Sequence, residues 1–447
     1  MGGEKRRSAC PYQTWTIYFF WGSAAGLSTA STGSLAEEEE NLPQVRRDDI
    51  PREAPGLPSC CRRHVPGRLP ALGPYPVPRN RVSSWDRSTP EGPHLPDDEL
   101  GLCTFPNFLR LWTNGIPPRR DLSLVIRNEK FDGVPVRIYS SRTVPAMKRK
   151  AVLYFHGGAG IFGSIGKATG TIPSQARTGD ATVVAVGYGL GPENPYPNQY
   201  IECLKAAVYL MKHGEDYGVD SSRIIISGDS CGANFATRIC QLLVDRRDLP
   251  KVHAQALIYP GLQALNLSLP SYQQNCRSPF LWSKLVTYFC CRYLNKSTSF
   301  ANDLLKGSHV PKASRVKYRK WVNADSIPER FKVRGYTEQD HSLSNFNPQL
   351  HEEMKELLSE NISPLLAEDA VVCKLPQTFL LTCEYDVLRD DGLLYMKRLM
   401  DNGVPVTWSH VENGMHAIMR GTSLFHLIPK TQRIWWLRLV LPLGKTA

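Results

Sequence analysis

The sequence predicts an α/β protein whose central sheet is mostly parallel, and three observations support this fold class. Short runs of β-branched and other apolar residues recur along the chain, as expected for buried strands. Stretches with helical apolar spacing separate most of these runs, and glycine-rich or polar turns follow several strand ends. Buried strands that alternate with helices indicate a parallel sheet covered by helices on both faces. The predicted strands are residues 122–126, 134–139, 152–155, 182–186, 224–226, 254–259, 378–383 and 404–410.

Residues 1–100 differ from the rest of the chain. Three basic residues at positions 5–7 precede an apolar aromatic run at 15–21, and small residues follow. This is the layout of a signal peptide or a weak membrane anchor. The alternative is a disordered tail with a chance aromatic cluster. The remaining N-terminal segment is rich in Pro and Arg and lacks apolar periodicity, so we expect a disordered linker.

The folded domain is predicted to span residues 101–447. Its first two strands flank Asp132-Gly133, which is a hairpin signal. The alternation of strands and helices lapses over about 262–363 and then returns. An insertion of this length after a core strand is typical of a lid over a site. The alternative is a helical packing layer that has no gating role.

A G-x-S-x-G motif follows the predicted strand 224–226 directly, at Gly228, Ser230 and Gly232. Apolar residues at helical spacing come next, so the motif has the strand, turn and helix that a nucleophilic serine needs. Such a turn lifts the serine hydroxyl away from the backbone. The motif alone is weak, because glycine-rich turns with an incidental serine are common.

A second glycine-rich segment, His156-Gly157-Gly158-Ala159-Gly160, follows the predicted strand 152–155. Small residues let backbone N–H groups approach a developing negative charge, so this segment is typical of an oxyanion loop. The alternative is a phosphate-binding loop. No Lys-Ser or Lys-Thr follows at P-loop spacing. Gly158, Gly160 and Gly163 have G-x-G-x-x-G spacing, but no predicted helix opens there, which argues against nucleotide binding.

Asp386 and His416, near the ends of the last two predicted strands, are the candidate acid and base that would activate Ser230. A serine is a poor nucleophile until a base accepts its proton, and a carboxylate orients that base. His416 lies in the loop after the last strand, and Asp386 lies at the end of strand 378–383. Asp390 and Asp391 are alternative candidates for the acid. Their place at the start of a helix already explains them, because acidic side chains stabilise a helix N-terminus. The order Ser230, Asp386, His416 is that of α/β-hydrolases.

Composition excludes several other classes of protein. The chain has 447 residues, 42% hydrophobic and 21% charged, with a formal net charge of +12. The positive charge is spread along the chain without interleaved aromatics, so a solvated basic surface is favoured over nucleic-acid binding. Attraction to an anionic membrane fits equally well. The 12 cysteines lack metal-binding spacing, and no cofactor or metal is expected.

The chain from about 102 to 416 resembles the arylacetamide deacetylase-like esterases of the hormone-sensitive-lipase group. The shared motifs are the 156–160 segment, Gly228-Asp229-Ser230-Cys231-Gly232, Tyr385-Asp386-Val387-Leu388-Arg389-Asp390-Asp391-Gly392, and Asn413-Gly414-Met415-His416.

This resemblance implies an α/β-hydrolase fold with a lid, carboxylesterase or deacetylase activity, and a lumenal, membrane-bound place in the endoplasmic reticulum. It implies that Ser230 is the nucleophile, Asp386 the orienting acid and His416 the base. The oxyanion hole would use the N–H groups of Gly157, Gly158 and Cys231. Cys231 itself departs from the family, which usually has Ala at this position.

We therefore expect a serine esterase or deacetylase acting on small lipophilic esters or amides. The alternative is an inactive protein of the same fold that binds a lipid or a protein partner. Three sequons, at Asn266, Asn295 and Asn361, would be glycosylation sites in a lumenal protein. The alternative location is the cytoplasm.

Overall fold

The computed structural model describes residues 107, 109–110, 122–142, 148–165, 181–339 and 345–420. The N-terminal signal or anchor and the linker predicted within 1–100 lie outside these residues. Within them, no helix has both the length and the apolar character needed to cross a membrane.

Eight strands form one sheet in the order β1-β2-β4-β3-β5-β6-β7-β8. The hairpin pairs β1 with β2 on either side of Asp132-Gly133, and β2 is also antiparallel to β4. The other neighbours are parallel, as the sequence predicted. The strands are β1 (Leu124–Phe131), β2 (Val134–Ser141), β3 (Arg149–Phe155), β4 (Ala181–Val186), β5 (Val219–Asp229), β6 (Ala254–Ile258), β7 (Gln377–Tyr385) and β8 (Val406–Met415).

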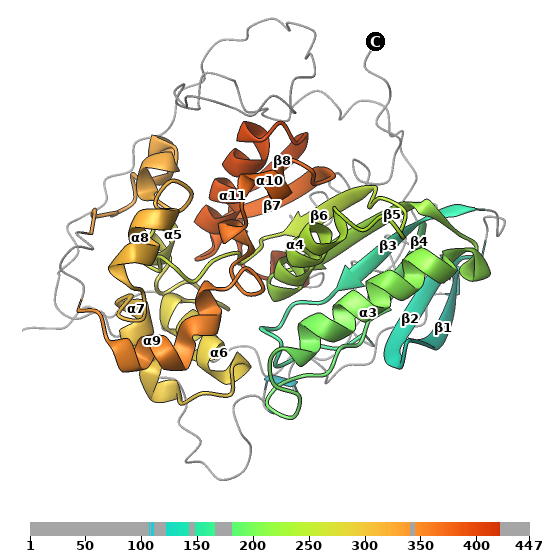
Figure 1. Ribbon diagram of the computed structural model, residues 1–447, viewed down its shortest axis with the longest axis horizontal. Helices are drawn as coiled ribbons and strands as arrows, with labels where there is room; N and C mark the ends of the chain where they lie inside the picture. Colours follow the sequence, from blue (N-terminus) through green and yellow to red (C-terminus); the bar gives the residue numbers. More distant parts are fainter. Residues whose placement is uncertain are drawn as a thin grey trace, which may run out of the picture. The chain divides into compact units, whose positions relative to one another are not determined.

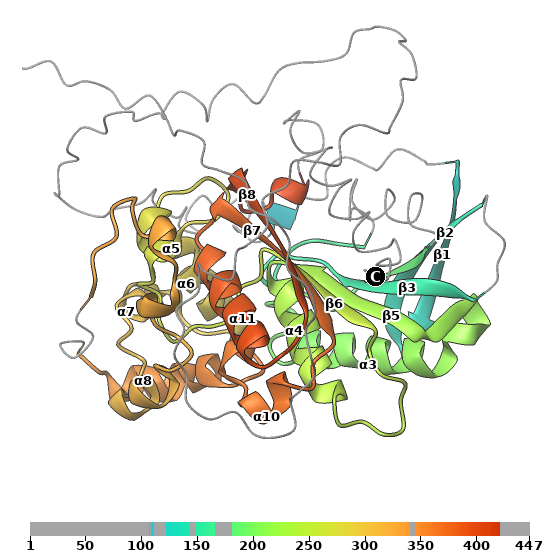
Figure 2. The same ribbon diagram turned by 90° about the horizontal axis from the view of Figure 1, so that it is seen from above.

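Three long helices cover one face of this sheet: α3 (Asn198–His213), α4 (Cys231–Leu243) and α11 (Arg389–Asp401). Figure 2 shows them along the same side of the strands. Their apolar residues share a buried cluster with alternate strand residues such as Leu153 and Ile226. The intervening strand residues, such as Val152 and Ile225, form a second cluster on the opposite face. Successive side chains along each strand point to opposite faces of the sheet, so the strands contribute to both apolar clusters.

The insertion between β6 and β7 consists of short helices, which gather at one end of the sheet (Figure 1). It has a small apolar core of its own, which includes Cys291, Leu304 and Met354. One of its helices, α6 (Ser283–Tyr293), places the ring of Tyr293 against Gly160 in the loop after β3. The insertion therefore packs over the carboxyl end of the sheet.

Shorter helices also occur within the described part of the chain. They are η6 (Gly214–Tyr217), α5 (Pro270–Gln274), α6 (Ser283–Tyr293), η7 (Thr298–Phe300), α7 (Ala301–Leu305), α8 (Lys312–Tyr318), η8 (Ala324–Ser326), η9 (Glu329–Phe331), α9 (Pro348–Met354), η11 (Lys355–Leu358), η12 (Pro364–Leu366), α10 (Asp369–Val372) and η13 (Ile418–Arg420).

Candidate active site

Ser230 occupies a strained turn between β5 and α4. Its backbone has φ 57° and ψ −122°, a conformation that costs free energy for any residue other than glycine. The two glycines of the motif are required by close backbone contacts. A Cβ on Gly228 would lie 2.3 Å from Gly232, and one on Gly232 would lie 2.1 Å from the carbonyl oxygen of Phe155. The sequence motif is therefore a sharp turn pressed against the neighbouring strand.

The three side chains predicted to act together lie within hydrogen-bonding distance. Nε2 of His416 is 2.9 Å from Oγ of Ser230, and Nδ1 of His416 is 2.8 Å from Oδ2 of Asp386. They come from the ends of β5, β7 and β8, because parallel strands bring their carboxyl ends to one edge. Asp386 is fully buried and His416 nearly so.

The hydrogen bonds also indicate which tautomer of His416 suits a neighbouring carboxylate. A carboxylate only accepts hydrogen bonds, so Nδ1–H of His416 donates to Asp386 and Nε2 is left to accept from the Ser230 hydroxyl. The second carboxylate oxygen of Asp386 accepts from the backbone N–H of Leu388 at 2.9 Å. The arrangement can therefore move the serine proton to a fixed imidazole.

The loop after β3 differs in one respect from the sequence prediction. The N–H of Gly157, expected to face the oxyanion, instead donates a 2.6 Å hydrogen bond to Oδ1 of Asp229. The hydroxyl of Tyr154 donates to the same oxygen at 2.7 Å. Asp229 is buried, and a buried carboxylate needs such donors. Gly157 is therefore a tether for the loop, and its N–H is already used.

The following residues turn sharply, since Gly158 and Ala159 both have positive φ angles of 124° and 54°. Among the described residues, their N–H groups have no hydrogen-bond partner. Cys231 is the first residue of α4, so its backbone N–H lies at the positive end of the helix dipole. These positions, at the carboxyl ends of β3 and β5, are suited to bind an anion.

His156 and Tyr188 support the base of this loop. Their rings stack with centroids 4.3 Å apart, and the Tyr188 hydroxyl donates to the carbonyl oxygen of His156. Sequence reasoning singled out neither Tyr188 nor Asp229 for such a role. The sequence offers one clue to the role of Asp229. It is a charged residue at the end of a buried strand, and a buried carboxylate requires hydrogen-bond donors.

Asp390 and Asp391 lie in the first turn of α11, as predicted, but their role is different from the one expected. Both are fully buried. Asp390 pairs with Arg389 and accepts from the N–H of Ser271, while Asp391 accepts from the N–H of Leu262. Burial raises the pKa of Asp391 to about 7. The two carboxylates therefore anchor the insertion to α11, which is more than a favourable charge at a helix start.

The three sequons differ in accessibility. Asn295 is exposed, with exposed Ser297 in the hydroxyl position of its sequon. Asn361 is half-buried and accepts a hydrogen bond from Arg238, while Ser363 of the same sequon is fully buried. Asn266 is half-buried and accepts from the Ser268 hydroxyl. On the folded protein, the Asn295 sequon is therefore the one of these three that a glycosylating enzyme could reach.

Within the described part of the chain, no group of three or more His, Cys, Asp or Glu side chains could hold a metal ion.

Comparison with known proteins identifies the family of this chain. A family model for the alpha/beta hydrolase fold matches residues 152–315 and 323–420. Human arylacetamide deacetylase-like 3 is 39% identical over 338 residues, which is 75% of this chain and 83% of that protein. Arylacetamide deacetylase of Bos taurus is 36% identical over 329 residues, which is 72% of this chain and 81% of that protein.

Solved structures share the fold. A thermostable esterase from Pseudomonas putida has a TM-score of 0.56 at 21% identity, covering 76% of this chain and 91% of that one. Carboxyl esterase 2 from Tuber melanosporum has a TM-score of 0.54 at 19% identity, covering 73% and 90%. The sheet, the motifs and the relatives together show that this chain belongs to the arylacetamide deacetylase-like family of α/β-hydrolase-fold enzymes.

Proposed function

We propose that this protein is a serine carboxylesterase or deacetylase that hydrolyses lipophilic esters or amides. The observation that carries the proposal is the continuous hydrogen-bonded chain from Ser230 through His416 to Asp386. The names of the relatives support the acyl-transfer chemistry and point to acetamides of aryl amines as one substrate class.

The reaction follows from these contacts. Nε2 of His416 takes the Ser230 proton as Oγ attacks the carbonyl carbon of the substrate. The tetrahedral intermediate collapses, and His416 gives the proton to the leaving alcohol or amine. Water then attacks the acyl-enzyme with His416 again acting as base, which releases the carboxylic acid and restores Ser230. Asp386 holds the imidazole and stabilises its cation throughout.

The oxyanion hole proposed here uses the N–H groups of Gly158, Ala159 and Cys231. Gly158 and Ala159 follow the tethered Gly157, and Cys231 begins α4 beside the nucleophile. A helix N-terminus also favours a negative charge. Cys231 in place of the usual Ala leaves the backbone donor unchanged, because the donor belongs to the main chain.

We also propose that the protein lies on the lumenal side of the endoplasmic reticulum membrane. The basic and aromatic N-terminal pattern and the exposed sequon at Asn295 support this location. The lumen supplies the glycosylation machinery that such a sequon needs.

A fluorophosphonate probe tests the mechanism, because it labels only an activated serine. Wild type should be labelled and should hydrolyse short p-nitrophenyl esters and an aryl acetamide. Ser230→Ala should lose both, on the order of 10⁴-fold or more in kcat, while it unfolds at the same temperature. Ser299→Ala, an exposed serine of the insertion, is the matched control. An unlabelled wild type would indicate a binding protein of the same fold.

A further inference from the structure

The turn that carries Asp386 is held by side chains of the insertion. Asn275 donates to the carbonyl oxygens of both Glu384 and Asp386, at 3.2 and 2.9 Å. The hydroxyl of Ser278 donates to the carbonyl of Tyr385 at 2.6 Å, and that of Ser271 donates to the carbonyl of Val387 at 2.7 Å. Four consecutive carbonyl groups around Asp386 thus depend on the insertion for these hydrogen bonds.

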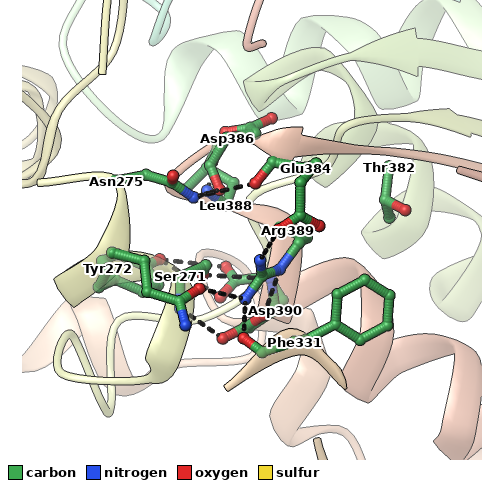
Figure 3. Close-up of polar contacts among 12 residues, drawn as sticks. Ser271, Tyr272, Asn275, Phe331, Thr382, Glu384, Asp386, Leu388, Arg389 and Asp390 are labelled. Carbon is green, nitrogen blue, oxygen red and sulfur yellow. Dashed lines mark hydrogen bonds and ion pairs between the residues drawn. The ribbon is translucent and has the colours of Figure 1, made fainter. Parts of the chain in front are cut away.

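A cluster of charged side chains around Glu384, two residues before Asp386, adds further contacts between the insertion and this turn. One carboxylate oxygen accepts from the buried guanidinium of Arg389 at 3.0 Å and from Arg334 of the insertion at 2.7 Å. The other oxygen faces Nε2 of His410 on β8 at 3.2 Å. Figure 3 shows Arg389 between Glu384 and Asp390, with Asn275 beside Asp386. Glu384 therefore joins the insertion, α11 and β8 at the base of the same turn.

The charge state of this cluster is consistent with an ionised Glu384. Burial raises the pKa of Glu384, but the hydrogen bond from His410 and the charges of Arg389 and Arg334 outweigh it, so its pKa lies below the usual value. Arg334 also donates to the backbone carbonyl of Glu384 at 3.1 Å. Its side chain is one-third exposed, so this contact can be changed without opening the core.

We propose that Arg334 and Asn275 are positioning residues that couple the seating of the insertion to the orientation of Asp386. This inference rests on the proposed function, since it assigns them an effect on the acid of the serine machinery. When the insertion is seated, its donors fix the carbonyls on both sides of Asp386. When these donors are lost, the turn relaxes and the carboxylate moves away from Nδ1 of His416. The insertion is then a part of the catalytic framework as well as a cover.

Arg334→Gln and Asn275→Ala test the proposal, with Arg330→Gln as the matched control. Arg330 lies on the same segment, is exposed and stacks on the rings of Phe331 and Trp408. The measurements are kcat and KM for a p-nitrophenyl ester, the acid limb of the kcat/KM profile, and the thermal unfolding temperature. Ser230→Ala is run in parallel, so a failure of the serine mechanism is recognised separately.

Both test variants should lower kcat by roughly 10-fold to 100-fold with little change in KM, as expected for a small displacement in an active site. The apparent pKa of the acid limb should fall by about half a unit or more, because a displaced carboxylate stabilises the imidazolium less. Arg334→Lys should recover part of kcat, since an ammonium can still reach Glu384.

Arg330→Gln should behave as wild type. The proposal is overturned if both test variants keep wild-type kcat. It is also overturned if they lose activity only in proportion to lost folded protein, with the acid-limb pKa unchanged, because that result defines a purely structural role. If neither variant folds, the two residues have a structural role and the proposal is likewise overturned.

Discussion

The backbone N–H of Gly157 donates a 2.6 Å hydrogen bond to Oδ1 of Asp229, a residue 72 positions further along the chain. Asp229 is the immediate neighbour of Ser230, so this bond ties the loop after β3 to the nucleophile turn after β5. The two strands are parallel neighbours, and Phe155 pairs with Gly228 at their ends. The buried carboxylate of Asp229 therefore links the serine turn to the proposed oxyanion loop, in addition to the pairing of the two strands.

Removal of this carboxylate should impair the reaction more than binding. Asp229→Ala should lower kcat by roughly 10² because the loop N–H groups lose their fixed positions. Asp229→Asn keeps one acceptor oxygen and should retain more activity. Ester hydrolysis and thermal unfolding of both variants check this, with the exposed Asp248→Asn as control. Equal activity of all three variants would show that the tether is dispensable.

Asp386, in the turn after β7, and Asp390, in α11, should differ in the effect of their substitution. Asp386→Asn should fold normally and lose about 10⁴ in kcat, since an amide favours the wrong imidazole tautomer. Asp390→Asn should instead destabilise the protein by about 2 kcal/mol, because it removes one of the two carboxylates that pair with the buried Arg389 guanidinium and leaves only Glu384. Denaturant unfolding and kcat are measured for each. The reverse pattern would reassign the orienting acid.

Mild acid should destabilise the insertion through His309. This side chain is almost completely buried, its Nε2 lies 2.9 Å from the carbonyl of Ala264, and its Nδ1 has no partner among the described residues. Burial lowers its pKa to about 4. The unfolded chain binds this proton more readily, so the stability from neutral His309 is present above about pH 6.5 and is lost as pH falls towards 4.

The loss should reach about 2 kcal/mol at pH 5 relative to pH 7.5. His309→Gln retains an amide that can donate to Ala264 but does not titrate, so its stability should change less over this range. Denaturant unfolding at the two pH values gives the comparison. A variant with the same pH dependence as wild type would assign the acid sensitivity to other groups.

Expression in animal cells should give one glycan, at Asn295. Wild type should shift in mobility after endoglycosidase H treatment, and Asn295→Gln should abolish the shift. Asn266→Gln and Asn361→Gln should leave it in place, because Ser363 is buried and the side chains of Asn266 and Asn361 accept internal hydrogen bonds. Absence of any shift in wild type, with cytosolic fractionation, would contradict the lumenal location.

Local patterns determined much of this protein. Every strand of the sheet overlaps a predicted run, although β1 and β5 are longer than predicted. The hairpin at Asp132-Gly133 and the helix that ends before Gly403 were also predicted, because each depends on the periodicity or backbone freedom of a few adjacent residues. The sequence also predicted that Ser230, Asp386 and His416 would meet, since parallel strands present their carboxyl ends at one edge. Their catalytic roles stay a prediction.

Contacts between distant residues decided the rest. The sequence could not show that the Gly157 N–H would meet Asp229, that Asp390 and Asp391 would be buried against the insertion, or that Asn275 would grip the turn of Asp386. Each of these depends on which of many polar groups becomes buried opposite which donor. That choice follows from how the insertion packs on the sheet, and no local pattern of residues encodes it.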